Sequence, residues 1–277
     1  MLMGARIIQD AKKPSHNNFD IWLGDFAPAL WALAVVWLMG SAPLLAGQSS
    51  PKTVRAGRPA SLYNVIDTPN AEVLDYGSFA FTTRFFANGG LLPSIAFGVF
   101  QRLMIGASWE LDNYIGHGKI DLQRPELQIK FRFFDGDGAL PASTVGYDSQ
   151  GYFYDKSKKE YLQDRRGLYL AFTKEMLAGG LEWTAGGNIS DFERDALRGF
   201  FNVSWVAPTG GLGAFAEYDN IRNVKWNRLN AGVNLFLSPF IQMGVHIRDI
   251  LGSGTQNNSS GLRRPERIID IRYLTSF

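Results

Sequence analysis

The alternation of apolar and polar residues in short runs is the feature that most constrains how this chain can fold. From Ile269 to the end of the given chain at Phe277, isoleucine, tyrosine and phenylalanine occupy one parity, while aspartate and arginine occupy the other. Leu274 is the one apolar residue on the polar parity of this run. Such a run predicts a β-strand with an apolar medium on one face and a polar medium on the other. Either a soluble core or a lipid bilayer could be that apolar medium.

Eleven further runs of this kind precede the last one, and helical periodicity is almost absent after Tyr76. The connections between them tend to alternate between short and long. Short turns on one rim and long loops on the other are typical of outer-membrane barrels. The longer connections include 113–125, 148–166, 219–227 and 249–265, with 87–93 and 190–196 of middling length. We therefore predict an all-β fold, a transmembrane antiparallel up-and-down barrel of about 12 strands.

Aromatic residues gather at the ends of the runs rather than in their middles. Two sets are expected to form belts at the two membrane interfaces. Those near short turns are Phe79, Phe133, Trp183, Trp205 and Phe240, and those near long loops are Phe85, Trp109, Tyr218 and Trp226. The terminal strand, with Tyr273 and Phe277, also resembles the signal that the outer-membrane insertion machinery reads. The alternative is the terminal strand of a secreted β-sandwich.

An uncharged segment, FAPALWALAVVWLMGSAPLLAG, covers residues 26–47 and follows several basic residues. Small residues follow it, as at a signal-peptide cleavage site. Its length would also span a bilayer, so retention as an anchor stays open. We expect residues 1–48 to be a signal peptide or apolar export helix, 49–75 a periplasmic linker or luminal segment, and 76–277 the barrel. An even strand number would place both barrel ends in the periplasm of a Gram-negative bacterium.

Composition excludes several classes of function. The net charge of +2 gives no electrostatic case for a nucleic-acid partner. The chain contains no cysteine, which excludes disulfides and thiolate metal sites. With three histidines and no cation-binding loop spacing, the sequence predicts no metal site and no cofactor.

Charged residues recur on the polar parity, where a barrel has its lumen. The predicted lumen-lining set is Arg84, Glu110, Asp112, Lys130, Arg132, Glu182, Glu217, Asp219, Arg228, His246, Arg248 and Arg272. Paired carboxylates such as Glu110 with Asp112 could do acid–base chemistry. A lattice of salt bridges inside a narrow barrel is the stronger interpretation, because both signs of charge are present. No histidine has a serine two residues away, so we predict no catalytic residue.

Two short stretches resemble a known family. The run DTPNAEVLDYGSF lies before the first strand, and GYDSQG runs into a long loop. Both are similar to segments of the YjbH-like outer-membrane barrels, although this chain has room for only one barrel. The resemblance implies a role in exopolysaccharide production or export. The residues from Asp67 to Asn70 are also of the types that commonly form a turn. The stretch could therefore be a simple turn or a plug in the lumen.

The long loop after GYDSQG mixes tyrosine with lysine and arginine. Aromatic rings stack on sugars and cations meet phosphates, so Tyr147, Asp148, Tyr152 and Tyr154 are candidate ligand residues. Expected partners are outer-membrane lipid, lipopolysaccharide, the insertion machinery and a polysaccharide. The expected function is a non-enzymatic barrel that supports surface polysaccharide production or export. A narrow diffusion channel for small polar solutes and a rim-located hydrolase are the alternatives.

Overall fold

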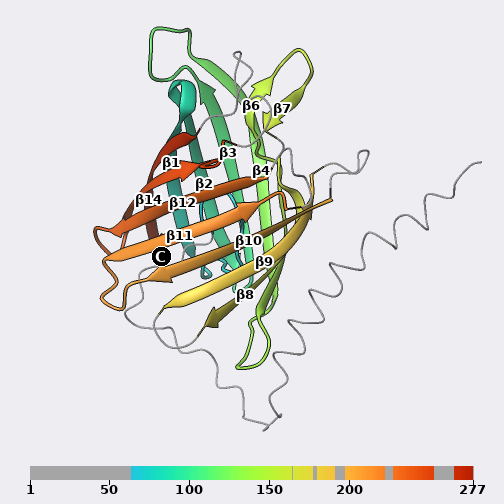
Figure 1. The fold of residues 1–277 in the computed structure, drawn as a ribbon, viewed down its shortest axis with the longest axis vertical. Coiled ribbons are helices and arrows are strands. Elements are labelled where there is room, and N and C mark those ends of the chain that lie inside the picture. The colour runs from blue at the N-terminus through green and yellow to red at the C-terminus, as the bar shows by residue number, and fades with distance from the viewer. Residues whose placement is uncertain are drawn as a thin grey trace, which may run out of the picture. The chain divides into compact units, whose positions relative to one another are not determined.

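The computed structural model describes residues 64–163, 165–176, 180–190, 197–221, 227–252 and 265–276. The expected export segment, residues 1–48, lies outside these ranges, as does Phe277. In the described part of the chain, twelve strands form one closed antiparallel barrel (Figure 1). The prediction of a barrel of about 12 strands is therefore confirmed. No helix in the described ranges has the length and apolar character needed to cross a membrane.

The barrel strands pair with their neighbours in the sequence, and β1 pairs with the last strand to close the ring. Between β5 and β8, a separate two-stranded sheet interrupts the sequence order. The barrel strands are β1 (Ser78–Phe86), β2 (Gly90–Phe100), β3 (Leu103–Asp112), β4 (Asp121–Phe134), β5 (Ala142–Asp148), β8 (Gly167–Met176), β9 (Leu181–Ile189), β10 (Leu197–Val206), β11 (Leu212–Asp219), β12 (Arg228–Phe236), β13 (Ile241–Arg248) and β14 (Glu266–Ser276). The separate sheet is the hairpin β6 (Tyr152–Asp155) and β7 (Glu160–Gln163).

The two rims differ in the length of their connections, and we call them the short-turn rim and the long-loop rim. β1 starts and β14 ends at the short-turn rim. Three connections on the long-loop rim differ from expectation. Residues 87–89 form one tight 3-10 turn instead of a loop over 87–93, because Asn88 and Gly89 adopt positive φ angles. The loop expected at 113–125 ends by Asp121, where β4 begins, and the loop expected at 148–166 contains the β6–β7 hairpin.

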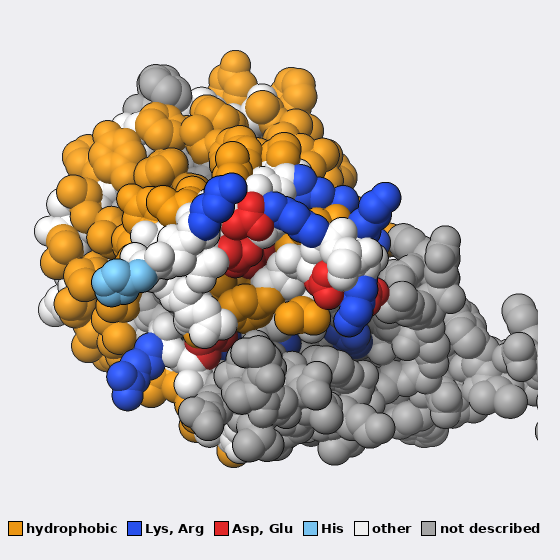
Figure 2. All heavy atoms as spheres, turned by 90° about the horizontal axis from the view of Figure 1, so that it is seen from above, with side chains coloured by type: hydrophobic (Ala, Val, Ile, Leu, Met, Phe, Trp, Pro, Cys, Tyr) orange, Lys and Arg blue, Asp and Glu red, His pale blue; other side chains and the backbone are white. Residues whose placement is uncertain are grey.

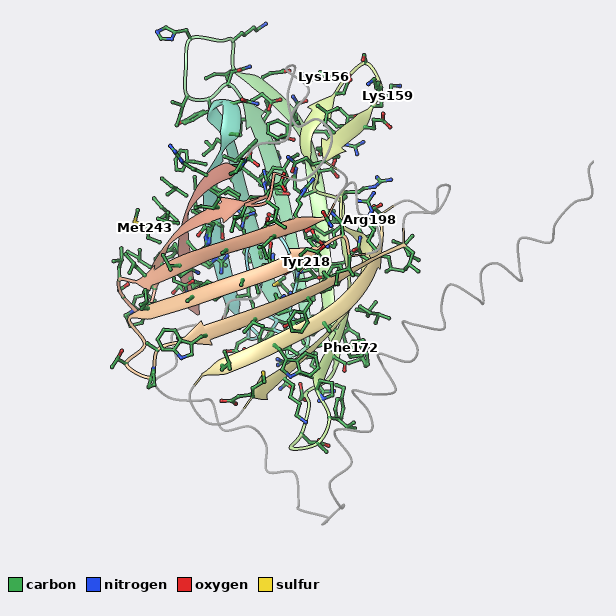
Figure 3. All side chains as sticks on the ribbon, viewed as in Figure 1. Lys156, Lys159, Phe172, Arg198, Tyr218 and Met243 are labelled. Carbon is green, nitrogen blue, oxygen red and sulfur yellow. The ribbon has the colours of Figure 1, made fainter. Side chains whose placement is uncertain are left out.

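The outer face of the barrel is apolar. Figure 2 looks onto the long-loop rim, with hydrophobic side chains covering the flank and charged side chains gathered on the rim. Outward side chains that are more than a third exposed include Phe81, Phe97, Phe131, Leu170, Phe201, Val233, Val245, Ile247 and Ile271. Phe172, Tyr218 and Met243, labelled in Figure 3, fall on the same outward parity. A closed barrel with an apolar exterior satisfies every backbone group inside lipid, so this surface suits a membrane.

The aromatic residues named above occupy strand ends. Phe79 is the second residue of β1 and contacts Phe97 of β2 and Tyr273 of β14, with ring centroids 6.1 and 5.9 Å apart. Phe85, Trp109 and Tyr218 lie at the opposite ends of their strands, whereas Trp226 falls outside the described residues. This arrangement is typical of the two aromatic belts of a membrane barrel.

Candidate functional site

Residues 64–75, which we call the luminal segment, run inside the barrel before β1 begins. Asn64 pairs with Pro69 in an antiparallel bridge, and the Val65 N–H donates to the Thr68 carbonyl at 3.1 Å. The segment thus turns at Val65–Thr68, two residues earlier than the turn expected at Asp67–Asn70. Its downstream arm leads to β1 at the short-turn rim, so the tip of the turn points into the lumen.

Glu217 of β11 binds the backbone of this turn. Its carboxylate accepts hydrogen bonds from the N–H groups of Ile66, Asp67 and Thr68 at 3.2, 2.9 and 3.0 Å. The Thr68 hydroxyl donates to the same carboxylate at 2.7 Å, and the Asn230 amide donates at 2.6 Å. An anion surrounded by convergent backbone N–H groups is strongly held. The buried Glu217 carboxylate therefore fixes the tip of the luminal segment to the barrel wall.

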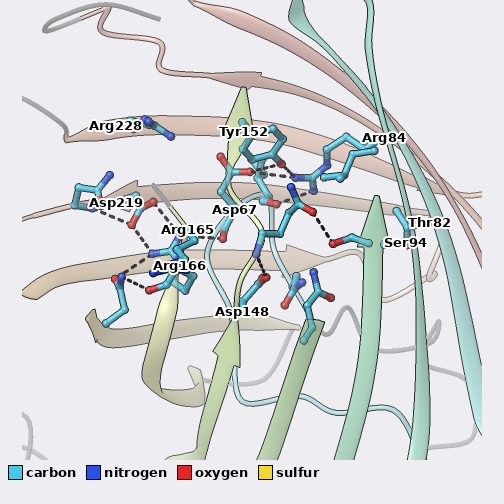
Figure 4. A pocket seen from close by; sticks show the side chains of 18 of the residues that line it. Asp67, Thr82, Arg84, Ser94, Asp148, Tyr152, Arg165, Arg166, Asp219 and Arg228 are labelled. Atoms are coloured by element: carbon cyan, nitrogen blue, oxygen red, sulfur yellow. Dashed lines mark hydrogen bonds and ion pairs between the residues drawn. The ribbon is translucent and has the colours of Figure 1, made fainter. Parts of the chain in front are cut away.

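The Asp67 carboxylate at the tip lies between arginines of two strands, of which Figure 4 shows Arg84. Its Oδ1 is 3.1 Å from the Arg84 guanidinium of β1, and its Oδ2 is 3.3 Å from that of Arg248 of β13. The Tyr152 hydroxyl lies 3.3 Å from Oδ1, and Arg166 donates to the Asp67 carbonyl at 3.0 Å. Two barrel strands and two parts of the connection between β5 and β8 thus converge on one residue of the luminal segment.

The ionisation of Asp67 follows from this surrounding charge. Burial works to raise its pKa, but the guanidiniums of Arg248 and Arg84 outweigh burial and lower the pKa to about 2. For Tyr152, burial raises the pKa of the hydroxyl to about 12. At neutral pH, Asp67 is therefore an anion and Tyr152 a neutral hydroxyl donor.

The base of the luminal segment is held differently. Val73 and Leu74 pack in a buried apolar cluster with Ala80, Ala96, Met104 and Leu274. The carbonyl oxygen of Asp75 lies 1.9 Å from the place where a Cβ on Gly98 would stand. Leu274, the apolar exception on the polar parity of the last strand, therefore faces the lumen to contact this segment. Glycine at 98 lets the backbone approach the wall.

Between tip and base, polar groups of the wall continue the contacts. The Lys130 ammonium donates to the carbonyls of Asn70 and Glu72 at 3.2 and 3.1 Å. Arg132 pairs with the Glu72 carboxylate at 3.2 Å, and the Ala71 N–H donates to the Thr173 hydroxyl at 2.8 Å. The luminal segment therefore contacts the wall along its whole described length.

Above the tip, toward the long-loop rim, lies a cavity of about 110 Å³, which we call the chamber. Its lining is rich in arginine and contains fewer acids (Figure 4). The charged lining residues are Arg84, Arg165, Arg166, Arg198, Arg228 and Arg272 with Asp67, Asp148 and Asp219. Arg166 is bound to Asp219 through two hydrogen bonds of 2.8 and 2.9 Å. Among the described residues, the lining therefore carries six guanidiniums and three carboxylates, an excess of positive charge.

Other residues of the predicted lumen-lining set have partners on the wall. Glu110 is fully buried and accepts the Phe153 N–H at 2.6 Å, while Asp112 accepts the Gln123 amide at 2.6 Å. The two acids therefore have different hydrogen-bond partners, and a register shift in the pairing of β3 with β4 falls between Trp109 and Leu111. Glu182 of β9 stands opposite Glu175 of β8, and both are partly exposed.

The remaining members lie deeper or at the chamber. The His246 imidazole Nε2 lies 2.8 Å from the Asp270 carboxylate, and both are buried. Gly232 and Gly244 flank this ring, and its Nε2 is hydrogen-bonded to Asp270 rather than to a serine. Arg228 donates to the Gln163 side chain at 3.1 Å, and Arg272 donates to the Thr82 hydroxyl at 3.3 Å. His246 therefore sits in a charge network within the described lumen.

The candidate ligand residues divide between three places. Tyr147 and Asp148 belong to β5 and not to a loop; Tyr147 shares the outward parity with its partners Ile129 and Leu168. Tyr152 belongs to the Asp67 cluster inside the barrel. Tyr154 lies on the β6–β7 hairpin, where its ring contacts Tyr161 at 5.0 Å and the Arg124 guanidinium at 5.1 Å. Of the four, Asp148 and Tyr152 both line the chamber, whereas Tyr147 and Tyr154 are not among its lining residues.

Sequence reasoning missed Arg165 and Arg166, which enter the chamber from the residues just before β8. The doubled arginine at the end of the long loop was the available signal. Of the predicted insertion signal, Tyr273 lies on the outer face of β14, and Phe277 is outside the described residues. Within the described part of the chain, no group of three or more acidic or histidine side chains has the geometry to hold a metal ion.

Comparisons with known proteins give a similar architecture at low identity. No protein-family model and no curated protein matches the chain. Among solved structures, it is similar to the KdgM porin with 8% identity and a TM-score of 0.48, over 72% of this chain and 99% of that chain. A second KdgM structure is described as a complex with disordered oligogalacturonate. The NanC porin (6% identity, TM-score 0.41, 72% and 99% coverage) and Omp33 of Acinetobacter baumannii (8%, 0.40, 74% and 100%) are similar as well.

Proposed function

We propose that this chain is an outer-membrane β-barrel with its short turns toward the periplasm and its long loops outward. The apolar exterior, the aromatic strand ends and the asymmetry of the two rims support this placement. The chamber then opens toward the outer side, and the luminal segment enters from the periplasmic side.

We propose that its function is a narrow diffusion path for small, negatively charged solutes, closed by the luminal segment in the conformation described here. The arginine-rich chamber is the observation that carries this proposal. Fixed positive charge in a narrow, low-dielectric channel raises the local concentration of anions and excludes cations. A barrel of twelve strands leaves a narrow lumen once no segment fills it.

The closure is compatible with transport because the middle and tip of the luminal segment are held mainly by polar contacts with the wall. Lys130, Arg132, Thr173 and Glu217 make these contacts, and all four are also suited to a hydrated lumen. Withdrawal of the segment would leave a polar wall rather than an apolar one. Solute passage therefore requires a displacement of residues 64–72.

Conductance in planar bilayers tests the proposal. The protein is extracted from membranes and compared with a double variant, Ala71→Cys with Thr173→Cys, which joins the segment to β8. The chain has no cysteine, so this pair forms without competition. We expect the oxidised variant to stay silent, and the reduced variant and the wild type to open with a reversal potential that favours chloride over potassium.

Cation preference, or silence of both proteins under every condition, would overturn the channel proposal. Permanent silence would favour the polysaccharide-support hypothesis, which rests on the resemblance to the YjbH-like barrels and stays a prediction. The absence of enzymatic activity also stays a prediction. A rim hydrolase could use His117, in the loop after β3, or Glu110 with Asp112. Substitution of His117 to Gln, or of both acids to their amides, should leave lipid hydrolysis by the purified protein unchanged.

A further inference from the structure

The arginines around Asp67 form an anion-binding site that the chain's own carboxylate occupies. Arg84 and Arg248 each approach a different oxygen of Asp67, at 3.1 and 3.3 Å, and Tyr152 adds a hydroxyl at 3.3 Å. Two guanidiniums and a phenol around one carboxylate form a complete carboxylate-binding site. Nothing in the geometry requires that the carboxylate belong to the luminal segment.

The site is held in shape by residues other than Asp67. The Arg84 guanidinium donates to the Tyr152 hydroxyl at 2.6 Å, and the Arg248 guanidinium stacks over the Tyr152 ring with its carbon 4.0 Å from the centroid. The Arg248 Nε also donates to Glu266 at 2.7 Å. If Asp67 withdrew, these contacts would keep the two guanidiniums in place, so a second anion would meet a preorganised site.

The site is also reachable from the chamber. Asp67, Arg84, Tyr152 and Arg166 all line that cavity, which lies on the long-loop side of the tip. An acidic solute drawn into the chamber therefore arrives beside the carboxylate that it would replace. Exchange of one carboxylate for another conserves the charge of the site, whereas a neutral solute would remove one of its anions and leave Arg248 with Glu266 and Arg84 with the more distant Asp270.

We propose that Asp67 is a tethered stand-in for an anionic ligand, and that a small carboxylate entering the chamber displaces it and releases the tip of the luminal segment. The inference rests on the proposed function and adds the event that opens the path. A ligand shifts such an equilibrium only by its preference for one state. The ligand would bind only the state in which the tip is released, because the same site cannot hold both Asp67 and the ligand.

Thiol labelling of a single cysteine tests this without any transport measurement. Val65 is 3% exposed, lies in the turn and packs in an apolar cluster with Phe215, so Val65→Cys reports release of the tip. The probe is malonate, with neutral malonamide as its matched control, added to the protein in detergent. We expect malonate to raise the rate of maleimide labelling roughly tenfold, as for a ligand that favours the released state about tenfold, and malonamide to leave it unchanged.

The test is repeated with a second substitution added to the Val65→Cys protein. Each double variant is first checked for the heat-modifiable gel band of a folded barrel. In Asp67→Asn, labelling should be fast without malonate and should not rise when malonate is added. In Asp75→Asn, whose carboxylate is exposed at the base of the segment, labelling should match that of the parent.

Equal labelling rates with malonate and malonamide would overturn the inference, as would slow, malonate-dependent labelling in Asp67→Asn. If Asp67→Asn does not fold, the comparison of malonate with malonamide in the Val65→Cys protein decides alone. A failure here with retained chloride preference in bilayers would remove only the displacement mechanism. Loss of chloride preference would remove the proposed function itself.

Discussion

The tip and the base of the luminal segment are held to the same barrel by different combinations of contacts. At the tip, buried charges and backbone hydrogen bonds fix the turn through Glu217, Arg84 and Arg248, beside the packing of Val65 and Ile66 on Phe215. At the base, Val73 and Leu74 are fixed by apolar packing. A buried carboxylate can be exchanged for another anion without leaving the guanidiniums unpaired, whereas apolar packing has no such substitute. The base is therefore the permanent attachment of the luminal segment. At the tip, the Asp67 carboxylate can be replaced by another anion.

The largest effect is expected where the base meets β2. In Gly98→Val, the new Cβ would stand 1.9 Å from the Asp75 carbonyl oxygen, a backbone atom that cannot rotate away. The cost should exceed the usual overpacking range of about 1–3 kcal/mol, so we expect loss of the heat-modifiable band. Gly138→Val is the control, because a Cβ there meets nothing within 4 Å. Normal folding of Gly98→Val would show that the base is not fixed.

Truncation of the apolar base should have the next largest effect. Leu74 is 5% exposed, and Leu74→Ala should lower the free energy of unfolding by about 2–5 kcal/mol, through lost burial and the cavity left behind. Urea unfolding in detergent, followed by tryptophan fluorescence, measures it. Leu140→Ala, in an exposed turn, should change the midpoint little. Equal urea midpoints for Leu74→Ala and Leu140→Ala would show that apolar packing does not fix the base of the luminal segment.

Loss of the tip acceptor should have a smaller and more local effect. In Glu217→Gln, one carboxylate oxygen becomes an amide donor that faces backbone donors, which should cost about 1–3 kcal/mol. We expect faster hydrogen exchange at residues 66–68, with exchange at 73–74 unchanged. Glu160→Gln on the β6–β7 hairpin provides the matched control. Acceleration across the whole segment would show that tip and base release together.

The smallest effect is expected outside the barrel. In the β6–β7 turn, Asp155 accepts hydrogen bonds from the Ser157 hydroxyl and from the N–H groups of Ser157 and Lys158, which lower its pKa. A lowered pKa means that its contribution to turn stability is present above the unfolded value and is lost as the pH falls through the folded one. Asp155→Asn should leave malonate-dependent labelling at neutral pH unchanged. A change would connect the hairpin to the chamber.

The sequence alone predicted the barrel, since alternation along each run determines which side chains share a face. It also placed Asp67 in a turn that could enter the lumen. It did not predict that Glu217 would hold that turn, because 149 residues separate it from Thr68. Leu274 was visible as an apolar exception on the polar parity, and the structure gives the reason: it packs against Val73 and Leu74.

Local pattern therefore determined the strands and their two faces, since each depends on residues one or two positions apart. Tertiary structure decided what occupies the lumen and which charges meet there. Tyr152 and Arg166 come from a long connection whose composition is that of any exposed loop, yet they lie beside Asp67 inside the barrel. Closure of the ring brings β1 and β13 to opposite sides of one carboxylate, and no periodicity in the chain encodes that meeting.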